Sequence, residues 1–438
     1  MCERTLQHGR TNWAQFVDDL PSCLVTERVW WSVKAAGIPV TLVTQLTGER
    51  LDQLRAQCST WRGPLAAVVY LPLFNAHGGK LSDHNRQVVQ NFTARTDELF
   101  RASETNNNGR GCQLRLVLMY ELFADPRAAS LLYPVNSLRN YARLMADTDL
   151  IANIDVDLLP SASISAALAD PRVLANYTAS CRARGVFVLP AFQLVCGTAM
   201  LADSLAATGD KAAIRVALNE RLRMFSFHKP MFHGPTLFEK WLGSAEPYPI
   251  TYALNYEPWY MSWRRETPWY DFRYRGYGNN KIAQVAAMNA AGATWFVSPH
   301  GFLVHRPHNS THMRDEFLRA KLTAKGLMEL RGTLYEHVES LWVAAQARMA
   351  AGSYAVRLEA GVRGCLEALP WWRVDAQQQQ QQQLQKQRQQ HQVQAQQQQQ
   401  QQMTQQQDQL KLLQQEQLQQ QQDWQQDQLP DLDPDLEG

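Results

Sequence analysis

The chain has 438 residues, a formal net charge of +2 and an apolar fraction of 45%. A nearly balanced charge leaves no bulk electrostatic footprint for DNA or RNA, so we expect no nucleic-acid partner. The apolar fraction is high enough to bury a substantial core. No stretch is long and apolar enough to span a membrane, and the start lacks an apolar signal region. Taken literally, these features predict a soluble, cytosolic chain.

Three N-glycosylation acceptor sequences point instead to a secretory lumen. They begin at Asn91, Asn176 and Asn309, and each reads Asn-x-Ser/Thr. An upstream membrane anchor, absent from this sequence, would reconcile the two indications.

Seven cysteines are present, and none forms a Cys-x-x-Cys pair, so no zinc or thioredoxin motif is visible. Because the number is odd, at least one thiol is unpaired in a monomer. Spacing alone leaves open whether disulfides join the others.

In chain order, strand-like and helix-like segments alternate. Runs of apolar and β-branched residues predict buried strands at 38–45, 65–73, 113–121, 149–157 and 185–194. Helical spacing or polarity predicts helices at 48–61, 82–102 and 137–148. The alternation predicts an α/β fold with an open, mainly parallel sheet and helices on both faces. In such sheets, ligands bind at the carboxyl ends of the strands.

The composition changes sharply near Asp375, after which the chain is mostly Gln with an acidic end. We interpret 375–438 as a Gln-rich tail that is disordered or transiently helical, because it cannot bury a core. Residues 1–374 form one large domain in this interpretation. We expect its first half, about 25–200, to bind the donor substrate of a group-transfer reaction. The second half, about 201–374, would then shape the site for the acceptor substrate.

Two acids follow the fourth predicted strand, at Asp155 and Asp157. In an extended chain, residues two apart point to the same side, so both carboxylates face one point. Two oxygen ligands there suit Mn²⁺ or Mg²⁺, which leaves other positions for phosphate oxygens. The ion neutralises charge that develops on a diphosphate leaving group. The alternative is a pair of solvated acids at a strand end.

A third metal ligand is expected from the histidines of 295–308. The apolar run 302–304 ends at His305, which is again a strand end. A neutral imidazole there completes a site that accepts Mn²⁺. His300 and His308 are alternatives, as is a His-x-x-His zinc site, which lacks Cys or Glu partners.

Aromatic residues and charges concentrate between 227 and 282. Glu257 and Asp271 are carboxylates in aromatic surroundings that favour a raised pKa, as a general base requires. Arginines in this stretch are candidates to pair with phosphate or a sugar carboxylate. They are Arg264, Arg265, Arg273 and Arg275.

Nine segments, in order, resemble glycosyltransferase family 49, which includes the second catalytic domain of the LARGE bifunctional transferases. They are VTLVTQ, WRGPLAAVVYLP, YPVNSLRNYAR, NIDVDLLPS, VLPAF, FHGPTLFEKW, YEPWY, YDFRYRGYGNNK and FLVHRPH. The resemblance implies a GT-A-type fold, an inverting reaction, a UDP-sugar donor, Mn²⁺ and a glycan acceptor. It implies glucuronic acid as the transferred sugar, and a type II Golgi membrane protein.

Site residues follow by position in these segments. The resemblance makes Asp155, Asp157 and His305 the metal ligands. Asp271 is the expected base, and Glu257 is the second candidate. It also implies contacts to the sugar donor. These are Thr44 and Gln45 at the end of the first strand, Arg139 and Asn140 on the helix before the metal motif, Asp155 in that motif, and His308.

Two departures leave alternatives open. Some related GT-A enzymes carry a basic carboxylate in a glycine-aromatic-glycine loop, where this chain has Asn279 and Asn280 after Gly278. The base is therefore open, as is a non-catalytic glycan-binding role. Another UDP-sugar, carrying xylose, galactose or N-acetylglucosamine, is a further alternative.

Overall fold

The computed structural model describes 23–74, 81–105, 111–123, 129, 132–309, 314–315, 334–373, 399, 402–403 and 407. The chain divides into two compact units, Met1–Trp372 and Arg373–Gly438. The division falls close to the predicted boundary at 374. Nearly all of the Gln-rich tail lies outside the described residues, so its disorder stays a prediction, as does the split into donor and acceptor halves.

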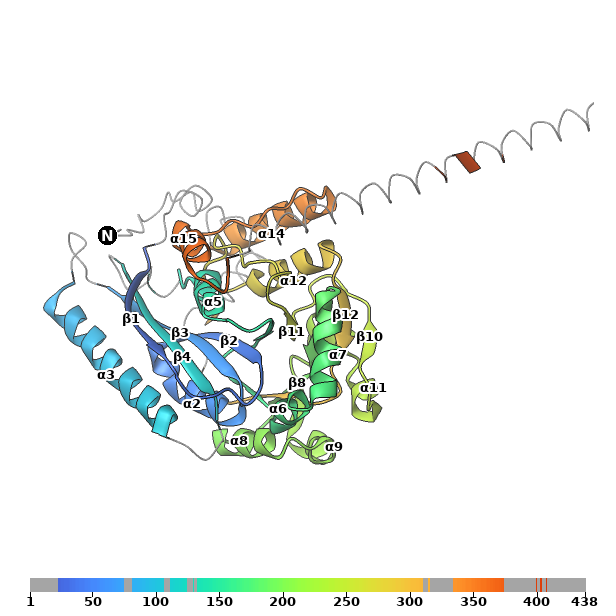
Figure 1. Cartoon of the computed structure of the whole chain (residues 1–438), viewed down its shortest axis with the longest axis horizontal. Coiled ribbons are helices and arrows are strands. Elements are labelled where there is room, and N and C mark those ends of the chain that lie inside the picture. Colours follow the sequence, from blue (N-terminus) through green and yellow to red (C-terminus); the bar gives the residue numbers. More distant parts are fainter. Residues whose placement is uncertain are drawn as a thin grey trace, which may run out of the picture. The chain divides into compact units, whose positions relative to one another are not determined.

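A nine-stranded sheet forms the centre of the first unit (Figure 1), in the order β1-β4-β3-β2-β5-β11-β7-β12-β10. Its strands are β1 (Val25–Trp31), β2 (Val40–Thr47), β3 (Pro64–Leu73), β4 (Gln113–Leu122), β5 (Leu150–Asn153), β7 (Gly185–Leu189), β10 (Tyr248–Ile250), β11 (Trp259–Trp263) and β12 (Thr294–Val297).

The parallel block of this sheet confirms the predicted fold class. Strand β2 pairs in parallel with β3 and β5, and β3 pairs in parallel with β4. All eight residues of β2 are buried or half-buried, which is typical of a parallel strand covered on both faces. Predicted strands at 38–45, 65–73 and 113–121 correspond to β2, β3 and β4.

Two strand predictions were wrong in detail. Strand β5 ends at Asn153, and the two acids lie in a turn whose Leu158 N–H donates to the Asp155 carbonyl at 3.0 Å. The predicted strand 185–194 is two strands, because Pro190 lacks the N–H that continues a ladder. After it the chain enters a second sheet.

That second sheet has four short strands in the order β6-β13-β8-β9. They are β6 (Leu158–Pro160), β8 (Ala191–Leu194), β9 (Leu222–Met224) and β13 (Leu303–His305). Strand β13 pairs antiparallel with β6, and His305 lies opposite Leu158. This register brings the last residue of β13 beside the turn that carries the two acids.

Helices cover both faces of the nine-stranded sheet (Figure 1). The α-helices are α2 (Leu51–Thr60), α3 (Asp83–Thr105), α5 (Val135–Leu144), α6 (Ala162–Leu168), α7 (Pro171–Arg182), α8 (Ala199–Thr208), α9 (Lys211–Glu220), α10 (Pro230–His233), α11 (Phe238–Gly243), α12 (Asn280–Ala290), α14 (Leu334–Ala350) and α15 (Ala360–Ala368). Two short 3-10 helices are η1 (Gly48–Arg50) and η2 (Gly234–Thr236). The predicted helices at 48–61, 82–102 and 137–148 correspond to η1 with α2, to α3 and to α5.

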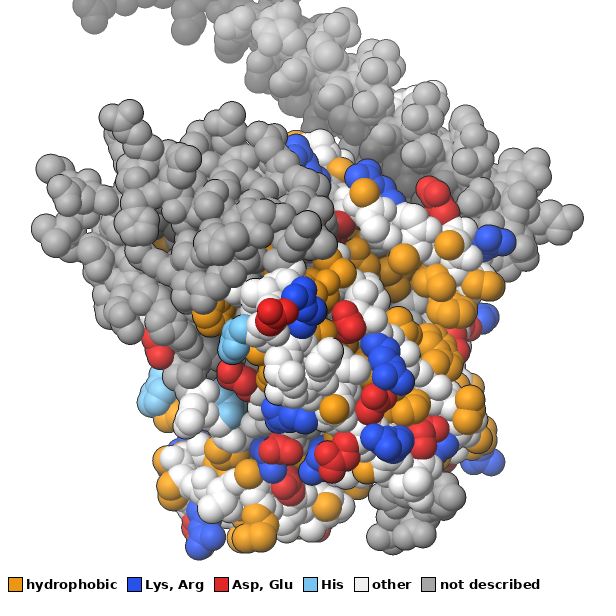
Figure 2. Space-filling view, turned by 90° about the vertical axis from the view of Figure 1, so that its left-hand side faces the viewer, with side chains coloured by type: hydrophobic (Ala, Val, Ile, Leu, Met, Phe, Trp, Pro, Cys, Tyr) orange, Lys and Arg blue, Asp and Glu red, His pale blue; other side chains and the backbone are white. Residues whose placement is uncertain are grey.

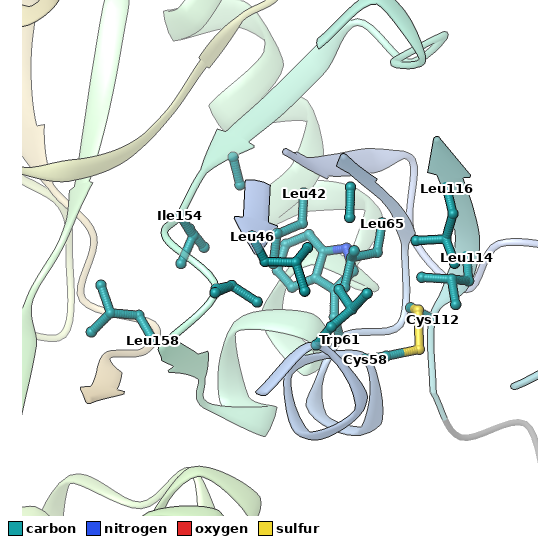
Figure 3. Packing of buried hydrophobic residues seen from close by; sticks show 14 of the residues in the cluster. Leu42, Leu46, Cys58, Trp61, Leu65, Cys112, Leu114, Leu116, Ile154 and Leu158 are labelled. Carbon is teal, nitrogen blue, oxygen red and sulfur yellow. A yellow bond between two sulfur atoms is a disulfide. The ribbon is translucent and has the colours of Figure 1, made fainter. Parts of the chain in front are cut away.

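The main core lies between the sheet and helices α2 and α3. Leucines of β2, β3 and β4 pack around Trp61, whose side chain is fully buried (Figure 3). A disulfide joins Cys58, on α2, to Cys112, just before β4. It links two segments 54 residues apart at the edge of this core. On the opposite face, α5 packs against β2 and β3.

Two tryptophans attach the end of the first unit to helix α5. The indole N–H groups of Trp371 and Trp372 both donate to the Leu144 carbonyl, at 2.8 and 3.0 Å. The guanidinium of Arg264 lies over the Trp372 ring, 4.3 Å from its centroid. These contacts fix residues 371–372 to α5, close to the division between the two units.

Lys and Arg side chains alternate with Asp and Glu on the face shown in Figure 2. Within the described residues, no helix combines the length and apolar character needed to cross a bilayer.

Candidate functional site

The candidate site lies where β2 and β5 end at the carboxyl edge of the sheet. The turn after β5 carries Asp155 and Asp157, with Val156 buried between them in the core. The antiparallel pairing of β6 and β13 then fixes His305 beside this turn. A backbone bond from the Arg306 N–H to the Asp157 carbonyl, 2.7 Å long, holds the two segments together.

Asp157 gathers two histidines around one carboxylate oxygen. Its Oδ2 lies 2.9 Å from Nε2 of His308 and 3.6 Å from Nε2 of His305. One ligand atom from each of the three residues lies within 4.8 Å of the others. Arg50, at the end of η1, approaches the same oxygen at 3.4 Å. The three ligand atoms converge closely enough to hold one cation.

One carboxylate and two imidazoles form a mixed nitrogen and oxygen donor set. Such sets suit first-row divalent ions such as Mn²⁺, whereas Mg²⁺ and Ca²⁺ prefer oxygen ligands alone. His308 was predicted both as a donor contact and as an alternative metal ligand, and it lies in this set. His300, an alternative ligand in the sequence, lies apart from it, near Tyr177 at a ring-centroid distance of 6.1 Å.

Asp155 has a different set of partners. Its Oδ1 accepts from Arg139 at 3.0 Å, and its Oδ2 accepts from the Trp259 indole at 2.8 Å and from Lys281 at 3.2 Å. Both of its oxygens are engaged by donors, and it is not in the three-residue cluster. We therefore interpret Asp155 as the anchor of a cationic cluster next to the ligands, which differs from the role predicted for it.

Electrostatics keep both acids ionised. Burial raises the pKa of Asp155, but Lys281 and Arg139 outweigh it and lower that pKa to about 2. Burial likewise opposes ionisation of Asp157, yet the contacts of its carboxylate with the imidazoles of His305 and His308 hold its pKa well below the ordinary range. The hydrogen bond to Asp157 in turn raises the pKa of His308.

A small pocket opens beside Asp155, between the ends of β2 and β5 and helix α5. It is lined by Val43, Thr44, Gln45, Arg139, Asn153, Ile154, Asp155, Tyr270 and Lys281. The side-chain amide nitrogen of Asn153 is buried and has no hydrogen-bond partner among the described residues. Two cations and an unsatisfied donor in one pocket favour an anionic or carbonyl-bearing ligand.

Glu257 lies at the edge of the cationic cluster. Its Oε1 is 3.6 Å from Lys281 Nζ, and its side chain keeps 35% of its surface exposed. The backbone N–H of Glu257 donates to the Phe232 carbonyl at 2.9 Å, which fixes the residue to the end of α10. A carboxylate that is both fixed and accessible has the properties required of a general base.

Asp271 does not share that accessibility. Its carboxylate is gripped by Arg273, with Nε–Oδ1 and Nη2–Oδ2 distances of 2.9 and 2.6 Å, and only 2% of its side chain is exposed. Tyr354 covers it with a further hydrogen bond of 3.4 Å. This burial argues against Asp271 as the base, because an acceptor hydroxyl would have to displace a buried ion pair.

Asn140 is likewise engaged in the fold. Its amide nitrogen donates to the Tyr270 carbonyl at 2.8 Å, and its oxygen accepts from the Tyr270 N–H at 3.0 Å. The predicted donor contact would require breaking this pair. The residue instead docks the 264–271 loop onto α5.

The four arginines proposed to read a phosphate or carboxylate also have other partners. Arg264 and Arg265 donate to the Trp371 carbonyl, Arg273 pairs with Asp271, and Arg275 pairs with Glu121. The cations that do line the pocket are Arg139 and Lys281.

Sequence reasoning missed four residues of the site, namely Arg50, Asn153, Trp259 and Lys281. Asn153, Trp259 and Lys281 lie inside the segments that resemble the family, in NIDVD, YEPWY and GYGNNK. Their residue types alone do not distinguish a functional side chain from a structural one. No sequence pattern marks Arg50 as a site residue, because only the folded chain brings η1 close to Asp157.

A protein-family comparison matches residues 39–331 to the family described as "Glycosyl-transferase for dystroglycan". The chain belongs to this family. It is thus a member of a glycosyltransferase family, and its α/β fold has the parallel strands and flanking helices expected from the sequence.

Curated relatives agree. The chain is 28% identical over 300 residues to "Glycosyltransferase-like protein LARGE" of Caenorhabditis elegans, covering 68% of this chain and 43% of the relative. It is 29% identical over 271 residues to "Xylosyl- and glucuronyltransferase LARGE2" of Homo sapiens, covering 61% of this chain and 33% of the relative. The chain thus spans less than half the length of these relatives.

Solved structures align weakly. A structure of S. aureus TarS residues 1–349 with UDP-GlcNAc has a TM-score of 0.31 and 11% identity, covering 76% of this chain and 78% of that one. The mannosyltransferase PcManGT of Pyrobaculum calidifontis, with GDP-Man and Mn²⁺, has a TM-score of 0.27 and 15% identity, covering 82% and 87%. Such low TM-scores support no inference about the site.

Proposed function

We propose that this chain transfers a sugar, glucuronic acid in the first instance, from a UDP-sugar to a glycan acceptor with inversion, in a reaction that depends on Mn²⁺. The observation that carries the proposal is the adjacency of a three-ligand cluster, Asp157 with His305 and His308, to a cationic pocket anchored by Asp155. Membership of the glycosyltransferase family supports the reaction class.

The donor set fits a divalent ion on its own chemistry. Asp157, His305 and His308 would hold the ion, and their nitrogen and oxygen atoms favour Mn²⁺ over Mg²⁺. When bound, such an ion supplies Lewis-acid stabilisation of a diphosphate leaving group.

The chain's own residues supply the rest of the electrostatics. Arg139 and Lys281 present two fixed positive charges in the pocket, both oriented by Asp155. Fixed cations in a partly buried site stabilise the negative charge that develops on the departing diphosphate, without reorganisation cost at the moment of reaction. Trp259 donates to Asp155 and lies under Lys281, whose Nζ is 3.9 Å from the ring centroid, so it holds this arrangement in place.

The reaction proceeds as an in-line displacement at the anomeric carbon. The acceptor hydroxyl oxygen forms the new glycosidic bond as the bond to the β-phosphate oxygen breaks, and UDP leaves with the electron pair. Glu257 takes the proton of the attacking hydroxyl, because it is the accessible carboxylate at the edge of the cluster. Attack opposite to the leaving group inverts the anomeric configuration.

The choice of glucuronic acid comes from the family resemblance and from charge. A uronic acid carries a carboxylate that can form a salt bridge with Arg139 or Lys281. A neutral hexose has no such group. The human relative's name includes both xylosyl- and glucuronyltransferase, and the aligned region covers 33% of it. A Golgi lumen is the location that accords with such a reaction.

The test is a donor screen with the purified chain, Mn²⁺ and a xyloside acceptor. Release of UDP from UDP-glucuronate, but less from UDP-xylose, UDP-galactose or UDP-N-acetylglucosamine, is the expected result. Asp157→Asn should abolish both transfer and Mn²⁺ binding measured by calorimetry.

Asp203→Asn is the matched control, because Asp203 pairs with the neighbouring Arg306 at 2.8 Å and lies outside the three-ligand cluster. Full activity of Asp157→Asn, or glycan binding without turnover of any UDP-sugar, would overturn the proposal.

A further inference from the structure

Two of the three Asn-x-Ser/Thr sequences lie wholly within described helices, and their asparagines belong neither to the three-ligand cluster nor to the pocket beside Asp155. Asn91-Phe92-Thr93 lies on α3, and Asn176-Tyr177-Thr178 lies on α7. The third begins at Asn309, and its last two residues lie outside the described residues. We propose that Asn91 and Asn176 are sites of N-linked glycosylation, with a lipid-diphosphate-linked oligosaccharide as the co-substrate.

Helix geometry turns each of these asparagines outward. Consecutive helical residues lie about 100° apart around the axis, so a residue next to a buried one can face solvent. In α7, Tyr177 is 2% exposed, and its hydroxyl lies 2.6 Å from the Ser298 hydroxyl oxygen. The preceding Asn176 is exposed. The buried Tyr177 anchors the helix while Asn176 stays accessible.

The same arrangement holds on α3. Phe92 packs against the main core, and Asn91 is exposed. The side-chain contact of Asn91 is its Oδ1, which accepts from Gln87 at 2.9 Å. An N-linked sugar is attached through Nδ2, so this hydrogen bond would survive. The amide nitrogen forms the new bond to the sugar's anomeric carbon and gives up one of its two protons to solvent, and the lipid diphosphate leaves with the electron pair.

An independent observation places the chain where this modification occurs. Cys58 and Cys112 form a disulfide at the edge of the core. Structural disulfides form and persist in oxidising compartments and are rare in the cytosol of mesophiles. The bridge therefore supports a route through the oxidising compartments in which Asn-x-Thr acceptors are used.

The glycans would also leave the candidate site open. Figure 1 shows α3 and α7 on opposite flanks of the nine-stranded sheet. Neither Asn91 nor Asn176 contributes to the three-ligand cluster or to the pocket beside Asp155. The inference is therefore independent of the proposed transfer reaction, and failure of one does not decide the other.

The test maps glycans on the full chain produced in eukaryotic cells. Peptide-N-glycosidase in ¹⁸O-water converts each glycan-bearing asparagine to labelled aspartate, which mass spectrometry locates. We expect label at Asn91 and Asn176. Thr93→Ala and Thr178→Ala should each abolish label at their own site, whereas Thr93→Ser and Thr178→Ser, which preserve the acceptor sequence, should retain it.

Two results would overturn the proposal. One is chain recovered from secretory membranes or medium with unlabelled asparagine at both positions. The other is chain found only in the cytosol, with Cys58 and Cys112 as free thiols. UDP-sugar transfer, assayed on the enzymatically deglycosylated protein, separately decides the proposed function.

Discussion

Lys281 is the residue whose removal gives the sharpest test of the cationic pocket. Its ammonium lies 3.2 Å from Asp155, 3.6 Å from Glu257 and 3.9 Å from the Trp259 ring centroid, and 5% of its side chain is exposed. Lys281→Met keeps most of the aliphatic stem and deletes the charge. A hydrogen bond to a charged group contributes about 1.5–3 kcal/mol, so we expect UDP to bind roughly 10- to 150-fold more weakly.

The assay is calorimetric titration of UDP in the presence of Mn²⁺, with melting temperature recorded in parallel. Lys281→Arg retains a positive charge and should recover part of the affinity. Lys211→Met is the matched control, because Lys211 also lies over a tryptophan, 4.4 Å from the Trp241 centroid, and its hydrogen bonds within the described part of the chain go to the backbone carbonyls of Trp241 and Ser244, both at 2.8 Å. That variant should lose stability while its UDP affinity stays unchanged.

The stability readout separates binding from folding. Without Lys281, Asp155 still accepts from Arg139 and Trp259, so the acid keeps two donors and the loss of stability should stay near 1–3 kcal/mol. A folded Lys281→Met protein with wild-type affinity for UDP would refute the reasoning, since the pocket cation would then face no part of the donor.

Three further outcomes follow from burial and covalent links. The free energy of unfolding should fall between pH 7 and pH 5 by about 2 kcal/mol less in His233→Phe than in the wild type, measured by denaturant unfolding. Burial lowers the pKa of His233 to about 3, so the unfolded chain takes up a proton near pH 6.5 that the folded chain does not. Replacing Cys58 and Cys112 by Ser should cost about 4 kcal/mol, because their bridge closes a 54-residue separation, and a reductant should then no longer alter the unfolding curve. Trp372→Ala should cost about 3–5 kcal/mol in the same assay, whereas removal of 375–438 should leave the melting temperature of the first unit unchanged.

The parallel part of the fold was predictable because its signal is local. Continuous β-branched runs such as 40–47 identify strands covered on both faces, and the helices between them have recognisable spacing. The antiparallel strands β1 and β11 were missed. Strand β11 enters the sheet between β5 and β7 from a segment about a hundred residues later than β5, and that pairing leaves no periodic trace near either strand.

Site residues were predictable where they directly follow an apolar run that marks the end of a strand. Asp157 and His305 were both expected at the ends of strands, and the pairing of β6 with β13 brings them together. Extended backbone would bring Asp155 to the same point, whereas a turn follows Asn153 and gives the two acids separate partners. A two-residue period holds only while the strand continues.

Acidity in an aromatic setting proved to be an ambiguous signal for a base. Glu257 and Asp271 satisfy it equally in the sequence, yet one side chain is 35% exposed and the other 2%. The difference comes from Arg273, two residues after Asp271. Its guanidinium donates through Nε and Nη2 to the two oxygens of the Asp271 carboxylate. Because an arginine so near in sequence can either supply a ligand-binding charge or cancel an acid, its partner must be known before either residue is given a role. If Glu257 is the base, Glu257→Gln should lose transfer while keeping UDP and Mn²⁺ binding, and Asp271→Asn should instead lower the melting temperature with binding and turnover changed in parallel.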